Sequence, residues 1–280
     1  IPPPSRGRSF GERHFQVKTV IFTDLDGSLL HARTYSFKDA LPALRLIQER
    51  RVPLILCSSK TRAEIEVYRE RLNNRDPFIS ENGGGIFIPA GYFSVPVGGG
   101  LLNDYTRISL GTPYHEIRRH VVNLRERMKV QVKGFGDMSV EEIARLTGLG
   151  RGEAALAKER EFDEPIVFPG DADEEFLAAV EKAGLRWTRG RFFHILGNSD
   201  KGKAVKILKR YYESEYGRIM TMGLGDGFND LPLLREVDHP VLIPREEGGY
   251  DPRVDFPQLT KAKKSGPAGW SEAVLGLLEP

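Results

Sequence analysis

The hydrophobic positions along the chain follow two alternating patterns. Residues 17–22, 52–57 and 218–224 are mostly apolar runs rich in β-branched side chains, which is typical of buried strands. Between the first two runs, apolar residues recur at helical spacing and predict a helix over 38–50. Strands that alternate with helices predict an α/β fold with a doubly wound parallel sheet, as in Rossmann-like proteins.

The pattern changes in the middle of the chain, between residues 91 and 196. Helical spacing over 113–128 is followed by short strand patterns, further helices and a predicted hairpin. We interpret 91–196 as a compact α+β domain inserted into the α/β core. The core then consists of 17–90 and 197–280.

Composition narrows the classes of function. The chain has 280 residues and a net charge of +2, which does not indicate a nucleic-acid or membrane binder. The single cysteine, Cys57, lies in an apolar run, so we expect a buried thiol, no internal disulfide and a cytoplasmic protein. No apolar run is long enough for a membrane span or a signal peptide. Residues 1–16, rich in proline and basic side chains, predict a flexible basic tail, with a nucleic-acid-binding arm as the alternative.

Two carboxylates, Asp24 and Asp26, directly follow the first predicted strand, and Gly27 supplies a turn. Ligands of parallel sheets bind outside the carboxyl ends of the strands. Carboxylates this close need either a bound proton or a cation, and Mg²⁺ binds to carboxylates and phosphate oxygens. A carboxylate can also be a nucleophile that forms an aspartyl phosphate. The alternative is a solvated strand end without chemistry.

Other polar residues follow apolar runs in the same way. Ser58 precedes a helix whose capping box is Thr61 and Glu64, and the free N–H groups of such a helix start bind phosphate. Lys60 and Arg62 either reach a substrate there or are solvated. Lys201 lies in the first turn of a predicted helix, where a positive charge opposes the helix dipole, which is typical of a functional residue.

A further motif, Gly-Asp-Gly-Phe-Asn-Asp, lies at 225–230 directly after the apolar run 218–224. Together, 24–30, Ser58, Lys201 and 225–230 resemble, in this order, the four motifs of the haloacid dehalogenase-type phosphatases. The resemblance implies that Asp24 is the nucleophile and that Asp26 is the general acid and base. It implies that Ser58 and Lys201 hold the phosphoryl group. It also implies a Mg²⁺ cofactor held by Asp24, Asp26 (through its backbone carbonyl), Asp226 and Asp230, and that the inserted domain is a cap over the site.

Stretches in the core and the inserted domain resemble, more narrowly, the mannosyl-3-phosphoglycerate phosphatases. They are 58–64, 78–83, 134–139, 157–165 and 266–270, and the resemblance extends over about 17–280. It implies hydrolysis of a phosphorylated glycoside with a carboxylate, for which Lys60, Arg62 and Arg186 are candidate partners. The candidate substrate-binding residues together are Ser59, Lys60, Thr61, Arg62, Glu81, Asn82, Gly83, Arg186, His194, Asn198 and Asn229.

Three alternatives remain open at this point. The substrate can be another sugar phosphate, such as glucosyl-3-phosphoglycerate or sucrose phosphate. The chain can be a binding module that has kept the fold and lost catalysis. It can also transfer the phosphoryl group to a sugar, as phosphomutases do.

Overall fold

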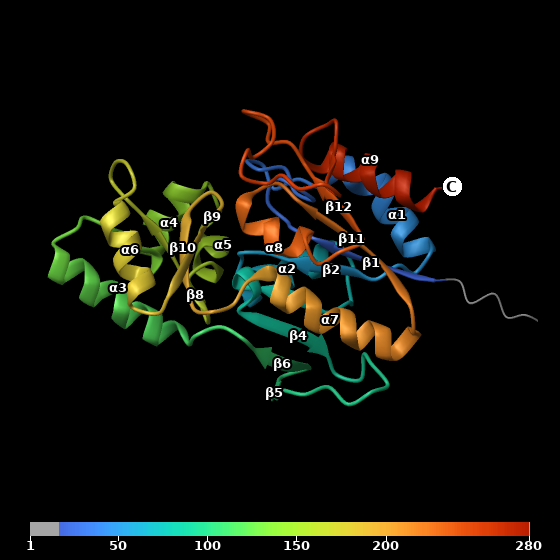
Figure 1. The fold of residues 1–280 in the computed structure, drawn as a ribbon, viewed down its shortest axis with the longest axis horizontal. Coiled ribbons are helices and arrows are strands. Elements are labelled where there is room, and N and C mark those ends of the chain that lie inside the picture. The colour runs from blue at the N-terminus through green and yellow to red at the C-terminus, as the bar shows by residue number, and fades with distance from the viewer. Residues whose placement is uncertain (1–16, 280) are drawn as a thin grey trace, which may run out of the picture.

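The computed structural model describes residues 17–279, so the predicted tail lies outside the described residues. A nine-stranded sheet forms the centre of the larger domain, in the order β13-β12-β11-β1-β2-β3-β4-β6-β5 (Figure 1). Its strands are β1 (Lys18–Thr23), β2 (Leu54–Cys57), β3 (Phe78–Ser80), β4 (Gly85–Pro89), β5 (Gly100–Leu102), β6 (Tyr105–Ser109), β11 (Ile219–Gly225), β12 (His239–Leu242) and β13 (Thr260–Lys261). The strands from β13 to β3 are parallel, and β4, β6 and β5 extend the sheet in antiparallel fashion.

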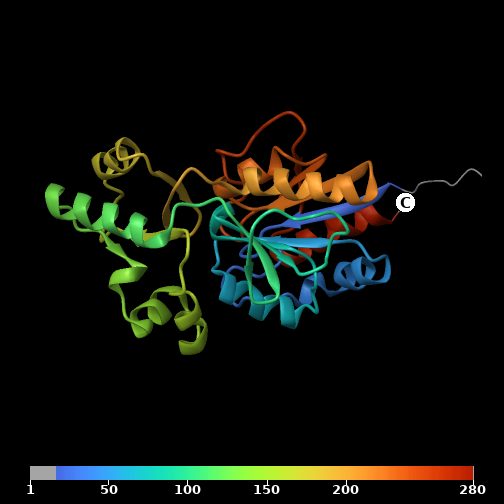
Figure 2. The ribbon, with the colours of Figure 1, turned by 90° about the horizontal axis from the view of Figure 1, so that it is seen from below.

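Helices cover both faces of this sheet, which confirms the predicted doubly wound α/β core. The helices α1 (Leu41–Glu49), α2 (Arg62–Arg71) and α9 (Gly266–Leu278) pack on one face, and α7 (Lys201–Tyr216) and α8 (Leu231–Leu234) on the other (Figure 2). Along β1, Ile21 packs on the first face, whereas Val20 and Phe22 pack on the second. The strand is apolar at consecutive positions because both of its faces are buried.

The smaller domain has its own four-stranded antiparallel sheet, in the order β7-β8-β10-β9. Two apolar clusters form its core, one around α3 and α6 and one around α4 and α5. The strands are β7 (Lys133–Gly134), β8 (Asp163–Val167), β9 (Arg186–Arg189) and β10 (Phe193–Leu196), and the helices are α3 (Tyr114–Met128), α4 (Val140–Thr147), α5 (Arg151–Leu156) and α6 (Glu174–Lys182). The predicted hairpin is β9 and β10.

One predicted boundary differs from the structure. We expected the core segment to end at residue 90, but β5 and β6 belong to the core sheet, where Gly85 of β4 pairs with Ser109 of β6. The strand pattern of these residues does not reveal which sheet they join, because the partner strand is chosen by tertiary packing. The inserted domain therefore begins after β6. Within the described residues, no helix has both the length and the apolar character that a membrane crossing requires.

Candidate active site

The carboxyl ends of three neighbouring parallel strands place the predicted acidic and hydroxyl groups together. Because β1 lies between β11 and β2, the residues that follow these strands, Asp24, Asp226 and Ser58, meet at one edge of the sheet. Gly27 makes the turn after β1 with a φ of +80°, and a Cβ there would lie 2.6 Å from Oδ2 of Asp226. Only glycine permits both this backbone conformation and this close approach.

Lys201 is a buried cation at the centre of the site. Its Nζ lies 2.6 Å from Oδ1 of Asp24 and 2.6 Å from Oδ1 of Asp230. Asp200 caps α7, since its carboxylate accepts a hydrogen bond from the backbone N–H of Lys203. Gly83 has a φ of +91°, and a Cβ on it would lie 2.1 Å from the carbonyl oxygen of Asp200. The start of α7, and with it Lys201, is thus held directly against the segment that follows β3.

Three carboxylates form a cluster around this lysine. Asp24, Asp226 and Asp230 each offer an oxygen, and these oxygens lie within 4.8 Å of one another. Burial raises the pKa of Asp24 to about 7, and burial together with the charges of Asp230 and Asp24 raises the pKa of Asp226 well above its usual range. Asp24 and Asp230 are buried, and Asp226 is partly exposed. The second cation of the cluster, Arg245, lies 3.8 Å from Oδ2 of Asp226 but is shared with Asp251. Negative charge therefore remains in excess over Lys201, and the donor set fits a hard divalent cation such as Mg²⁺.

Asp26 was predicted to hold the metal through its backbone carbonyl, which leaves its carboxylate for another partner. Its Oδ2 lies 2.8 Å from Nζ of Lys60, and its Oδ1 is buried without a hydrogen-bond partner among the described residues. Lys60 itself is buried, and its ammonium group also lies over the ring of Tyr35, 4.9 Å from the centroid. The structure therefore places Asp26 and Lys60 as a pair beside the carboxylate cluster.

A cleft between the two domains opens onto this pair. Five predicted site residues line it: Asp26, Ser59, Lys60, His194 and Asp226. It is also lined by Tyr35, Arg160 and Arg191, which the sequence analysis did not single out. Arg160 and Arg191 lie in a stretch and a hairpin that the sequence analysis had noted, whereas nothing in the sequence marks Tyr35.

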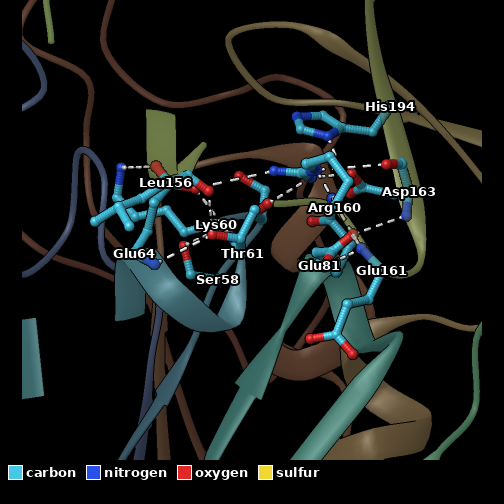
Figure 3. Close-up of polar contacts among 12 residues, drawn as sticks. Ser58, Lys60, Thr61, Glu64, Glu81, Leu156, Arg160, Glu161, Asp163 and His194 are labelled. Carbon is cyan, nitrogen blue, oxygen red and sulfur yellow. Dashed lines mark hydrogen bonds and ion pairs between the residues drawn. The ribbon is translucent and has the colours of Figure 1, made fainter. Parts of the chain in front are cut away.

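The side chains of Glu81 and Thr61, two predicted substrate-binding residues, make contacts within the protein and do not line the cleft. The Glu81 carboxylate is fully buried and accepts hydrogen bonds of 2.8–3.1 Å from the backbone N–H groups of Glu161, Phe162 and Asp163 (Figure 3). The Thr61 hydroxyl completes the predicted capping box and donates to the carbonyl of Leu156. Both residues join the core to the inserted domain. Thr61 contacts Leu156, the last residue of α5, and Glu81 contacts residues 161–163, which follow this helix.

The other predicted substrate-binding residues lie outside this cleft. Arg62 pairs with Glu66 and Glu161 and does not line the cleft. A separate cavity, which Lys201 also lines, is lined by Asn82, Arg186 and Asn229. Asn198 accepts from Lys203 and from Arg186 outside both cavities. Gly83 acts through its backbone, and Ser58, whose Oγ accepts from the Lys60 N–H, is buried beside Asp24's strand.

The sequence and the fold were compared with those of known proteins. The profile of the haloacid dehalogenase-like hydrolases matches residues 21–92. A glucosyl-3-phosphoglycerate/mannosyl-3-phosphoglycerate phosphatase of Persephonella marina is 45% identical over 92% of this chain and 97% of its own length. The protein of the same name from Methanococcoides burtonii is 42% identical over 94% and 98%. A mannosyl-3-phosphoglycerate phosphatase of Pyrococcus horikoshii is 38% identical over 80% and 90%.

Solved structures share the fold at low sequence identity. A Thermoplasma acidophilum protein superposes with a TM-score of 0.64 at 16% identity, over 94% of this chain and 99% of that one. The sucrose-phosphatase of Synechocystis, solved with sucrose and phosphate, superposes with a TM-score of 0.59 at 11% identity, over 94% and 99%. These two likenesses concern the fold alone.

Proposed function

Because the chain belongs to the haloacid dehalogenase-like hydrolases, and among them to the family of its glucosyl- and mannosyl-3-phosphoglycerate phosphatase relatives, we propose that it hydrolyses mannosyl-3-phosphoglycerate to mannosylglycerate and phosphate. The observation that carries the proposal is the contact of Lys201 with Asp24 within the carboxylate cluster. This cluster borders a cleft with three cationic residues, Lys60, Arg160 and Arg191. Asp26, Glu64 and Asp226 line the same cleft, so its charges are mixed. Arg191 donates to the backbone carbonyls of Leu146 and Thr147 and has no carboxylate partner among the described residues, so its charge suits an anionic group of the substrate.

The proposed reaction has two steps and uses Asp24 as the nucleophile. An oxygen of Asp24 attacks phosphorus and forms an aspartyl phosphate, while the bond from phosphorus to the glycerate oxygen breaks. Asp26 enters this step protonated and gives the proton to the departing oxygen, after which its carboxylate pairs with Lys60. Asp26 then accepts a proton from water, whose oxygen attacks the same phosphorus, so that phosphate leaves and the Asp24 carboxylate is restored.

The surrounding residues orient these groups. Lys201 holds one oxygen of Asp24 at 2.6 Å, which leaves the other oxygen for the attack. Lys60 holds Asp26 toward the cleft. We assign Mg²⁺ to Asp24, Asp226 and Asp230, where a bound ion supplies charge that the phosphoryl oxygens need during transfer. Ser58 and Lys201 are proposed to contact those oxygens as well.

Glucosyl-3-phosphoglycerate is the second candidate substrate. The relatives from Persephonella marina and Methanococcoides burtonii carry both sugars in their names, whereas the Pyrococcus horikoshii relative carries mannosyl alone. The first two are also more similar to this chain.

A phosphate-release assay with a substrate panel tests the proposal. The purified chain is incubated with Mg²⁺ and either glycosyl phosphoglycerate, with sucrose phosphate and simple monoesters alongside, in the presence and absence of EDTA. Rapid release from a glycosyl phosphoglycerate that EDTA stops is the expected result. Release from other monoesters only would contradict the substrate, and release only when a sugar acceptor is present would indicate phosphoryl transfer.

A further inference from the structure

His194 is a buried residue of β10 whose ring lines the cleft between the domains. Only 5% of its surface is exposed, and its Nδ1 lies 3.1 Å from Oδ2 of Asp163 (Figure 3). Asp163 is fully buried and is surrounded by donors. Its Oδ2 also accepts from Nδ2 of Asn82 at 3.1 Å, and its Oδ1 pairs with the guanidinium group of Arg160. These contacts hold the imidazole in one orientation.

The surroundings also determine where the proton of the ring lies. An ionised carboxylate only accepts hydrogen bonds, so Nδ1 carries the proton that lies between His194 and Asp163. Burial, with the positive charges of Arg160 and Lys201, lowers the pKa of His194 to about 3, against the opposite effect of Glu64 and Glu164. The guanidinium group of Arg160 already balances the charge of Asp163, so the buried ring does not need to be charged at neutral pH, and Nε2 is left as an acceptor.

No described residue donates a hydrogen bond to this Nε2, although the ring borders the cleft. A phosphate or carboxylate oxygen of a substrate has no proton to offer it at neutral pH. A hydroxyl group has one. The free acceptor thus suits the sugar end of a substrate, while the cationic residues of the cleft suit the anionic end.

We propose that His194 is a specificity-determining residue whose Nε2 accepts a hydrogen bond from a hydroxyl of the glycosyl group, in a tautomer that Asp163 imposes. That the hydroxyl belongs to a glycosyl group rests on the proposed function. The tautomer does not rest on it, because it follows from contacts within the protein. The two parts are therefore tested separately.

The first test is a nitrogen NMR spectrum of the histidine rings in the full-length protein. His194→Asn identifies the signals of His194, and this change keeps a side-chain donor for Asp163. We expect a proton on Nδ1, none on Nε2, and no titration of the ring between about pH 5 and pH 8, the range in which an ordinary histidine changes charge. A proton on Nε2, or a ring that titrates in this range, would overturn the proposal irrespective of any activity.

The second test compares wild-type protein with His194→Asn on substrates that each lack one sugar hydroxyl. On the complete substrate, we expect the variant to lose about 3- to 10-fold in kcat/KM, the value of one neutral hydrogen bond, mainly through KM. The deoxy substrate that lacks the partner hydroxyl should have a kcat/KM lower by the same factor with the wild-type protein. With the variant, the complete substrate and this deoxy substrate should have equal kcat/KM. His115→Asn, at an exposed histidine of the same domain, is the matched control.

The outcomes separate this proposal from the proposed function. Equal losses by the variant on every substrate, including monoesters without a sugar, would overturn the role of His194 and leave the phosphatase activity intact. Failure of the wild-type protein to use either glycosyl phosphoglycerate would overturn the proposed function, and with it the glycosyl hydroxyl as the partner of Nε2.

Discussion

The ammonium group of Lys60 lies 2.8 Å from Oδ2 of Asp26 and makes the two residues a charged pair inside the interdomain cleft. Arg62, two positions later, pairs instead with Glu66 and Glu161 outside the cleft. Both cations lie near the start of α2 and were candidates in the sequence, where Lys60 was favoured and Arg62 was left open. Of the two, Lys60 therefore lines the cleft and is the candidate for a role in the reaction.

We therefore expect Lys60→Met to lower kcat/KM by about 10- to 100-fold, less than the removal of a group that contacts the reacting oxygen. Arg62→Met is the matched control and should change it less than about threefold, because part-exposed ion pairs contribute about 0–1 kcal/mol. Steady-state kinetics of both variants, with circular dichroism to verify folding, measure this. Similar losses in the two variants would contradict the assignment.

The two carboxylates after β1 should differ in their response to amide substitution. Asp24→Asn removes the nucleophile, so turnover should vanish. Asp26→Asn should lose about 10²–10⁴-fold, the usual range for acid–base catalysis. Phosphate release under saturating substrate measures both. Near-normal turnover by the Asp24→Asn protein would refute the mechanism.

The carboxylate cluster predicts a metal-dependent stability. Mg²⁺ at about 100 times its Kd should stabilise the native state by about 2.7 kcal/mol and raise Tm by several degrees, because an ion that binds only the folded chain shifts the equilibrium. Asp226→Asn should lose most of this response. Asp255→Asn, at an exposed carboxylate paired with Lys261, should keep it. Thermal unfolding of the three proteins with Mg²⁺ and with EDTA gives the comparison, and an equal response in all three would argue against the cluster as the site.

Glu81 should make stability depend on pH. Burial raises its pKa from 4.5 to about 7, against the opposing effects of Arg160 and two backbone N–H groups. The folded state therefore binds this proton more tightly than the unfolded state, and the free energy of unfolding falls as pH rises from about 4.5 to 7. At about 1.4 kcal/mol for each tenfold change in proton affinity, the fall is about 3 kcal/mol.

Urea unfolding of the wild-type protein and of Glu81→Gln at pH values on either side of this window measures the effect. The variant should lack this part of the pH dependence, because its amide does not ionise. Because Glu81 contacts the backbone of 161–163, Glu81→Gln should also affect stability more than the KM of the substrate. Identical pH profiles for the two proteins would show that Glu81 does not titrate in the window.

Two glycines with positive φ test how Lys201 is positioned. Gly83 and Gly91 have φ values of +91° and +71°, but a Cβ would meet the Asp200 backbone only at Gly83 and nothing within 4 Å at Gly91. Gly91→Ala should cost about 1–2 kcal/mol, the strain of the backbone conformation alone. Gly83→Ala should cost more and should also lower kcat, since it displaces the start of α7. Chemical denaturation and kinetics of the pair distinguish strain from displacement; equal effects would contradict this account.

Much of the core and of the catalytic edge was predictable from the sequence. Consecutive apolar runs separated by amphipathic segments predicted the parallel sheet with helices on both faces, and the predicted capping box at Thr61 is present. That Asp24 and Asp226 meet was implied by the resemblance to the haloacid dehalogenase-type phosphatases. The parallel pairing of β1 with β11 then brings both residues to one edge of the sheet. Local pattern was sufficient for the elements and for the placement of these residues at strand ends.

The roles of residues between the domains were decided by tertiary structure alone. Glu81 resembles a substrate contact in the sequence, but its carboxylate is used by backbone N–H groups 80 positions later. Likewise, β6 follows the predicted core boundary and still joins the core sheet. A side chain's partner depends on which distant segment packs against it, and no periodicity along the chain encodes that choice. The sequence by itself thus determined the elements and the chemistry of the strand ends. Packing between the domains determined which polar groups remain free to meet a substrate.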